Sequence, residues 1–299
     1  MSSLSDPHRP NWQSVRARSA YGFDALAQLS RLCPGRLQES AVFLVIARIC
    51  LPDWINEDGC LGIPANSTKF VTAHAVSVSL NRPFETVRRH VSWLADQNLI
   101  YIDNRRISLS LGSRAKDIIE FFQSRHECLL QFTKRLIEAD DMASLSDGFD
   151  SMRFPFVSTL TAAIDLDLVP FEINPSLHEN LERTAIYAGF AYLGTQHIMN
   201  NPVLSAKYRH INTPNECRVA VSIRKVASLV GVSYSTAYRQ TNYLASVGLL
   251  SKTESRLFVV KSNDLLQNEL NEASVKYFTY LRKKMRDLIR HGSVAELQV

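Results

Sequence analysis

The chain has 299 residues, 45% of them hydrophobic, and is therefore long enough for two domains with separate cores. Its 34 Lys and Arg residues outnumber its 29 Asp and Glu residues, which gives a net charge of +5 and favours a polyanionic partner. The five cysteines stand far apart and form no C-x-x-C pair, which argues against a disulfide framework and against a zinc site.

The sequence lacks the common motifs of enzymes. It contains no G-x-G-x-x-G, no phosphate-binding loop, no H-E-x-x-H and no G-x-S-x-G, and its eight histidines lack metal-ligand spacing. We therefore expect no catalytic residue, no cofactor and no metal. The amino terminus has no apolar signal-peptide core, and no run approaches the roughly 18 apolar residues of a membrane span. We expect a soluble, cytoplasmic protein without a membrane partner.

Residues 1–36 predict a basic amino-terminal arm and a helix. Arg9, Arg16 and Arg18 precede a helical pattern at 23–32. Basic arms of this kind can lie in the minor groove of DNA, and a frayed terminus is the alternative.

Residues 37–112 predict a first domain of three helices and a hairpin. An apolar helix at 40–51 is stopped by a proline, and Thr72 is the expected N-cap of a short helix at 73–80. A break at Asn81-Arg82-Pro83 leads into a helix at 84–97 that ends at Asn98. The apolar periodicity then changes from 3.6 to about two, which predicts a β-hairpin with strands at 99–102 and 107–109.

Residues 113–177 predict a helix followed by a linker. Apolar residues at near-helical spacing indicate a trailing, packing helix at 113–137. The next segment, 138–177, reads as an acidic linker and connector, because 138–150 contains five acidic residues and no basic one.

Residues 178–262 repeat the first plan, and 263–299 predict a basic amphipathic helix. The second domain has an apolar helix at 183–198, a short helix at 223–230 with Ser222 as its N-cap, a helix at 234–247 and a hairpin at 249–260. The helices at 114–137 and 275–290 each carry an apolar seam. Such a seam packs on another helix, either within the chain or in a second chain as a homodimer.

An offset of 150 residues aligns the two domains. Residues 72–110 align with 222–260 without a gap. The identical pairs are Val76/Val226, Thr86/Thr236, Arg89/Arg239, Leu94/Leu244, Ala95/Ala245, Leu99/Leu249 and Arg106/Arg256. Because the substitutions between them also preserve apolar positions, we interpret the pattern as an internal duplication.

Both copies resemble the winged helix-turn-helix superfamily of bacterial transcription regulators. The second copy, VGVSYSTAYRQTNYLASVGLL at 230–250, follows that superfamily's pattern closely. The first, LNRPFETVRRHVSWLADQNLI at 80–100, departs at Asn81, Pro83 and Asn98. The resemblance implies a mainly α fold with small β-hairpin wings (α+β), built as two winged-helix domains joined by the acidic linker and the trailing helices.

The resemblance also implies that the third helix of each copy enters the major groove of DNA with its outward face. That face carries Glu85, Arg88, Arg89 and Ser92 in the first copy, and Ser235, Tyr238, Arg239 and Asn242 in the second. Thr86 and Thr236 are expected phosphate contacts. The candidate set also includes Arg105, Arg106, Lys252 and Arg256 at the hairpin tips, together with Arg82, Arg224 and Lys225. The alternative for each single arginine is an ordinary solvated surface.

Three neighbours of that face are expected to pack instead. His90 is interpreted as a half-buried packing residue, and Trp93 and Tyr243 as covers of the core.

We predict a sequence-specific regulator of transcription that binds double-stranded DNA and is associated with the nucleoid. RNA polymerase is a further candidate partner. Two alternatives stay open: a plasmid-type replication initiator that binds repeated origin sites, and a winged-helix scaffold protein of chromosome segregation.

Overall fold

A computed structural model describes residues 12–139, 154–173, 180–209, 213–261 and 264–296. Arg9 of the expected basic arm and most of the expected acidic linker lie outside the described residues. Within them the fold is mainly helical with two small antiparallel hairpins, as the sequence predicts. Of the helices described, none is long and apolar enough to cross a membrane.

The chain forms two compact units, each made of three stretches of sequence. Unit 1 comprises residues 1–27, 132–146 and 176–282, and unit 2 comprises residues 28–131, 147–175 and 283–299. The division falls inside three helices, α1 (Trp12–Leu32), α5 (Ala115–Glu138) and α11 (Asp264–Glu296). Each of these helices therefore contributes side chains to both cores.

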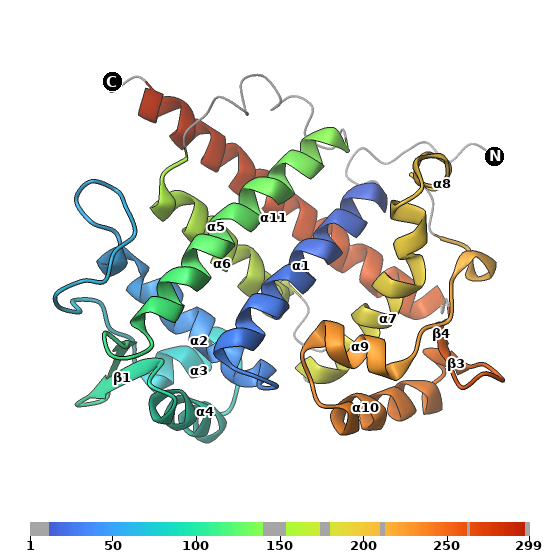
Figure 1. Ribbon diagram of the computed structural model, residues 1–299, viewed down its shortest axis with the longest axis horizontal. Helices are drawn as coiled ribbons and strands as arrows, with labels where there is room; N and C mark the ends of the chain where they lie inside the picture. The colour runs from blue at the N-terminus through green and yellow to red at the C-terminus, as the bar shows by residue number, and fades with distance from the viewer. Residues whose placement is uncertain (1–11, 140–153, 174–179, 210–212, 262–263, 297–299) are drawn as a thin grey trace. The chain divides into compact units, whose positions relative to one another are not determined.

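Unit 2 is built around α2 (Leu37–Cys50), which continues into a 3₁₀ turn, η1 (Leu51–Trp54). Helix α2 is apolar on nearly every side, and Phe43 and Ile46 have no exposed surface. It contacts α3 (Ala73–Leu80), α4 (Phe84–Asp96), the hairpin of β1 (Ile100–Asp103) and β2 (Arg106–Leu109), and α6 (Phe156–Ile173) (Figure 1). A helix surrounded in this way must bury apolar side chains all round, which explains its composition.

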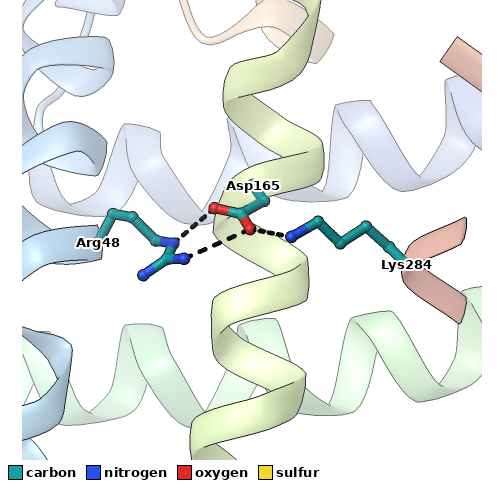
Figure 2. Close-up of polar contacts among 3 residues, drawn as sticks. All are labelled: Arg48, Asp165 and Lys284. Atoms are coloured by element: carbon teal, nitrogen blue, oxygen red, sulfur yellow. Dashed lines mark hydrogen bonds and ion pairs between the residues drawn. The ribbon is translucent and has the colours of Figure 1, made fainter. Parts of the chain in front are cut away.

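Helix α6 lies where the sequence predicts only a connector. Its Asp165 accepts from Arg48 Nε of α2 at 2.5 Å and from Lys284 Nζ of α11 at 2.6 Å (Figure 2). The carboxylate is mostly covered, with 14% of its side-chain surface exposed. One acidic residue thus joins three helices of unit 2.

Unit 1 is built around α7 (Leu181–Met199), which contacts α8 (Pro202–Lys207), α9 (Ile223–Val230), α10 (Tyr234–Ser246) and β4 (Phe258–Val260). A short 3₁₀ turn, η4 (Asn215–Cys217), precedes α9. A Cβ on Gly189 of α7 would meet Val226 Cγ1 at 3.0 Å, so glycine permits the close approach of α9.

The two units contain the same order of elements. We call residues 37–109 the first helix–hairpin segment and residues 181–260 the second. Helices α9 and α10 begin and end 150 residues after α3 and α4, from Ala73 to Ile223 and from Asp96 to Ser246. In each segment a bridge ties the hairpin to the residue before the N-cap of the short helix, Val71 to Ile107 and Val221 to Phe258.

The local signals at the helix ends are confirmed. Thr72 Oγ1 accepts from Ala75 N at 3.2 Å, and Ser222 Oγ accepts from Lys225 N at 3.4 Å. The left-handed C-caps of α3 and α9 are Asn81 (φ 50°) and Gly231 (φ 74°). Asn and Gly tolerate this conformation best, so the turns need those residue types.

The second hairpin differs from the ungapped alignment. In β1–β2, Asp103 pairs with Arg106 across Asn104 and Arg105, both of which have positive φ. In the second hairpin, β3 (Leu250–Lys252) and β4, Thr253 N donates to Leu257 O at 2.8 Å, so that three residues separate the pair. The prediction that Arg106 and Arg256 are equivalent is therefore wrong.

The equivalent of Arg256 is Arg105. Both residues adopt the left-handed conformation, with φ of 60° and 69°, and both stand directly before the second strand's paired positions. Two-residue and three-residue hairpin loops each demand positive φ at this place, which the sequence identity alone did not reveal.

The apolar seams of the trailing helices are buried within the chain. The seam residues are Ile118, Phe122, Leu129, Phe132 and Leu136 of α5, and Phe278, Leu281, Met285 and Leu288 of α11. Each exposes 2% of its surface or less. Of the two options predicted for these seams, the structure favours packing within the chain.

Candidate nucleic-acid interface

Helix α4 separates an apolar face from a charged one. Val87, Val91 and Leu94 are buried, as the 3.6-residue periodicity requires. The four predicted contacts on the opposite face, Glu85, Arg88, Arg89 and Ser92, are all exposed.

Two bonds order that face. Arg88 Nε donates to Glu85 Oε2 at 2.9 Å, and the Ser92 hydroxyl donates to the Arg88 carbonyl at 3.0 Å. No hydrogen bond or ion pair joins Arg89 to another side chain in the part of the protein that the structure describes. Its guanidinium therefore keeps all of its donors available.

Helix α10 repeats this division with different chemistry. Ala237 and Leu244 are buried, whereas Ser235, Tyr238, Arg239 and Asn242 are exposed. This face carries no acidic residue.

A second tyrosine, which the sequence analysis missed, extends this face. Tyr234 and Tyr238 stack with ring centroids 6.2 Å apart and planes at 27°, and each ring is about half exposed. The four-residue spacing of the two tyrosines could have predicted this stacking, because residues four apart are neighbours on the surface of a helix.

The expected phosphate contacts lie in the first turns of these helices. Thr86 and Thr236 are both half-buried. Ser233 caps α10 by accepting from Thr236 N at 3.1 Å, and its hydroxyl also lies 3.0 Å from Thr236 Oγ1. Pro83 occupies the cap position of α4 and supplies no side-chain bond.

In each segment a polar contact joins the third helix, α4 or α10, to the central helix, α2 or α7. The two contacts involve equivalent positions of the third helices. His90 Nδ1 lies 3.1 Å from Glu39 Oε1 of α2, and Arg183 Nε of α7 donates to Gln240 Oε1 at 3.2 Å. His90 is half-buried, as expected. His90 and Gln240 directly follow Arg89 and Arg239, so these bonds hold the backbone of each third helix next to its arginine.

The carboxylate of Glu39 is held in its ionised form. Burial by itself would raise the pKa of Glu39, but the His90 hydrogen bond, its own backbone and the nearby Arg36 together lower it. A buried carboxylate of this kind stabilises the fold only while it is charged.

An arginine also covers the matched aromatic residue in each segment. The Arg36 guanidinium carbon lies 5.4 Å from the ring centroid of Trp93, and that of Arg183 lies 3.6 Å from Tyr243. Trp93 is half-buried, but Tyr243 has 45% of its surface exposed. Tyr243 therefore supports Arg183 as a cation–π partner more than it covers the core.

The hairpin tips expose their basic residues. Arg105, Arg106, Lys252 and Arg256 are all exposed. The guanidinium carbon of Arg106 lies 5.3 Å from the ring centroid of Phe70, which restrains it, whereas Arg105 lies in the turn itself.

The remaining candidates flank the short helices. Arg224 and Lys225 are exposed in the first turn of α9, where the helix dipole disfavours cations and favours an anion. Arg82 is half-buried and has interactions of its own. An anion bound near this turn would relieve the unfavourable position of the two cations.

Among the described residues, no group of three or more His, Cys, Asp or Glu side chains lies together so as to hold a metal ion. Comparison of the chain with known protein families, with curated proteins and with solved structures finds no match.

Proposed function

We propose that this protein is a sequence-specific, double-stranded DNA-binding regulator of transcription. In this proposal the two helix–hairpin segments are winged helices related by duplication, and α4 and α10 are their recognition helices. Each recognition helix enters a major groove, and the hairpins lie along the phosphate backbone.

The observation that carries this proposal is the matched pair Arg89 and Arg239. Both are exposed on the outward face of the third helix, and the next residue of each helix is bonded to the central helix of its segment. An exposed arginine on a solvated surface needs no helix held at this point. Major-groove recognition does need a firmly held helix, because a bidentate bond to guanine tolerates little displacement.

The surrounding charge supports the same partner. The tips and first turns add Arg105, Arg106, Arg224, Lys225, Lys252 and Arg256, all exposed. Contacts from such residues to phosphates position a protein on DNA without reading its sequence. A scaffold function in chromosome segregation does not account for basic residues at both tips and on both third helices.

A gel-shift experiment tests the proposal. The full chain is mixed with duplex fragments of its own genome, and unlabelled bulk DNA is added as competitor. We expect discrete complexes with a subset of fragments, and their affinity should fall steeply as salt rises, because bound phosphates release counterions. Equal binding to all fragments, or none, would contradict sequence-specific recognition.

Mapping of the bound sites then distinguishes regulation from replication. Sites beside promoters support a regulator. Repeated sites confined to an origin, with opening of the neighbouring duplex, would favour the replication initiator instead.

A further inference from the structure

We propose that the two segments recognise different base pairs, so that one chain binds an asymmetric duplex site. Helix α4 reads G·C pairs, and α10 reads A·T pairs with thymine methyl groups beside the guanine that Arg239 contacts. This inference rests on the proposed function, since it assigns bases to the two recognition helices.

The chemistry of the two faces differs at matched positions. At the offset of 150 residues, the pairs are Glu85 with Ser235, Arg88 with Tyr238, Arg89 with Arg239, and Ser92 with Asn242. Only the third pair is conserved in type. All eight side chains are exposed, so the difference in chemistry between the two faces is accessible to a binding partner.

The α4 face suits G·C pairs. A carboxylate accepts only, so Glu85 matches the cytosine N4 amino group and is repelled by phosphates and by groove acceptors. Its 2.9 Å bond to Arg88 Nε pairs the two side chains on the exposed surface. Arg89 retains the parallel donors that match guanine O6 and N7.

The α10 face suits A·T pairs. The Asn242 amide can donate from its NH2 group to adenine N7 and accept from adenine N6 at its carbonyl oxygen, the bidentate pairing seen in the major groove. Tyr234 and Tyr238 present stacked, half-exposed rings, which provide apolar surface for a thymine methyl group. The absence of an acidic group on this face removes the acceptor that would favour cytosine.

The experiment is a selection of bound duplexes by the full chain. The probe is a double-stranded library with a randomised stretch of about three helical turns. We expect one enriched site with two unlike elements, the first rich in G·C pairs and the second containing A·T pairs. Enrichment of a palindrome, or of two identical elements, would overturn the inference and leave the proposed function standing.

Variants assign each element to its helix. Arg89→Ala should relax the base preference at the G·C element alone, and Asn242→Ala should relax it at the A·T element alone, each by about fivefold to 150-fold. Arg135→Ala serves as a charge control, because Arg135 is exposed on α5 outside both segments. Relaxation of the same element by both variants, or of the opposite elements, would overturn the assignment.

A methyl-deletion probe tests the tyrosine contact. Replacing thymine by uracil in the selected site should weaken binding by the wild-type chain about fourfold, the equivalent of one buried methyl group. Tyr238→Ala should bind the thymine and uracil duplexes equally. Equal binding of both duplexes by the wild-type chain would remove the thymine assignment.

In the selection experiment, failure to enrich any duplex would overturn the proposed function together with this inference.

Discussion

Arg89 and Arg239 are equivalent residues in two differently composed faces, and this equivalence makes them the first residues to test. Arg89→Ala and Arg239→Ala should each weaken binding to a specific duplex by about 1 to 3 kcal/mol, because each removes one bidentate donor pair. Fluorescence anisotropy at fixed salt measures the loss. Arg135→Ala should bind like the wild-type chain.

Both arginines are exposed and lie outside the core, so their removal should leave thermal unfolding unchanged. Unchanged DNA affinity in both variants would place the contact surface elsewhere.

Glu39 is a residue whose contribution depends on pH. Its bonds to His90 and Arg36 lower its pKa in the folded state, so the unfolded chain, with an ordinary pKa of about 4.3, takes up a proton first as the pH falls. The stability that Glu39 contributes is therefore complete above pH of about 4.3 and is lost below it.

Glu39→Gln should lower the free energy of unfolding at neutral pH by about 1 to 3 kcal/mol, because it weakens charge-assisted hydrogen bonds. The difference from the wild-type chain should shrink as the pH is lowered through the pKa of Glu39. Urea unfolding across that range measures it, with exposed Glu120→Gln as control. A difference that stays constant with pH would contradict this account.

At the scale of elements, Asp165 of α6 is the shared acceptor for cations from two other helices. Asp165→Ala leaves Arg48 and Lys284 facing each other without their shared acceptor (Figure 2). We expect the free energy of unfolding to fall by about 1 to 3 kcal/mol, less than for fully buried pairs because both cations are partly exposed.

Denaturant unfolding monitored by circular dichroism checks this value. Asp165→Asn, which keeps the shape and one acceptor, should lose less than Asp165→Ala. Asp96→Ala removes an exposed carboxylate at the end of α4 and should change stability by no more than about 0.5 kcal/mol. An equal response of all three variants would rule out a specific role for Asp165.

Elements defined by local signals could be predicted from the sequence. The bounds of α3, α4, α9 and α10 agree with the prediction to within about one residue, because caps such as Thr72 and Ser222 and the left-handed Asn81 and Gly231 act within a few residues of the chain. The outward faces of α4 and α10 follow from the same periodicity.

Elements defined by distant contacts could not be predicted. Pro170 lies inside α6 and suggests a break, yet the buried residues around Asp165 hold the helix together. The bonds of His90 and Gln240 to the central helices join residues more than 50 positions apart, so no local sequence pattern predicts them.

At the scale of the whole molecule, binding should depend on the total positive charge that reaches the phosphates. The logarithm of the affinity should fall linearly with the logarithm of the salt concentration. Removing one phosphate contact with Arg105→Ala should reduce that slope by about one, without altering which sequence is preferred.

Titration of the selected duplex at several salt concentrations measures the slope for the wild-type chain and for Arg105→Ala. Arg135→Ala should keep the wild-type slope. If affinity were independent of salt, or if Arg105→Ala changed the preferred sequence, the assignment of the hairpin tip to the backbone would be wrong.

The three stretches that compose each unit determine how the protein can be dissected. A break in the peptide chain between residues 140 and 153 yields two fragments, and neither contains a complete unit, because unit 1 needs both 1–27 and 176–282. Such fragments should be insoluble or unfolded when expressed alone and should regain structure when co-expressed. Complementation of this kind makes the break a suitable place for a split reporter, whereas a half-length truncation is not a valid way to isolate one recognition helix.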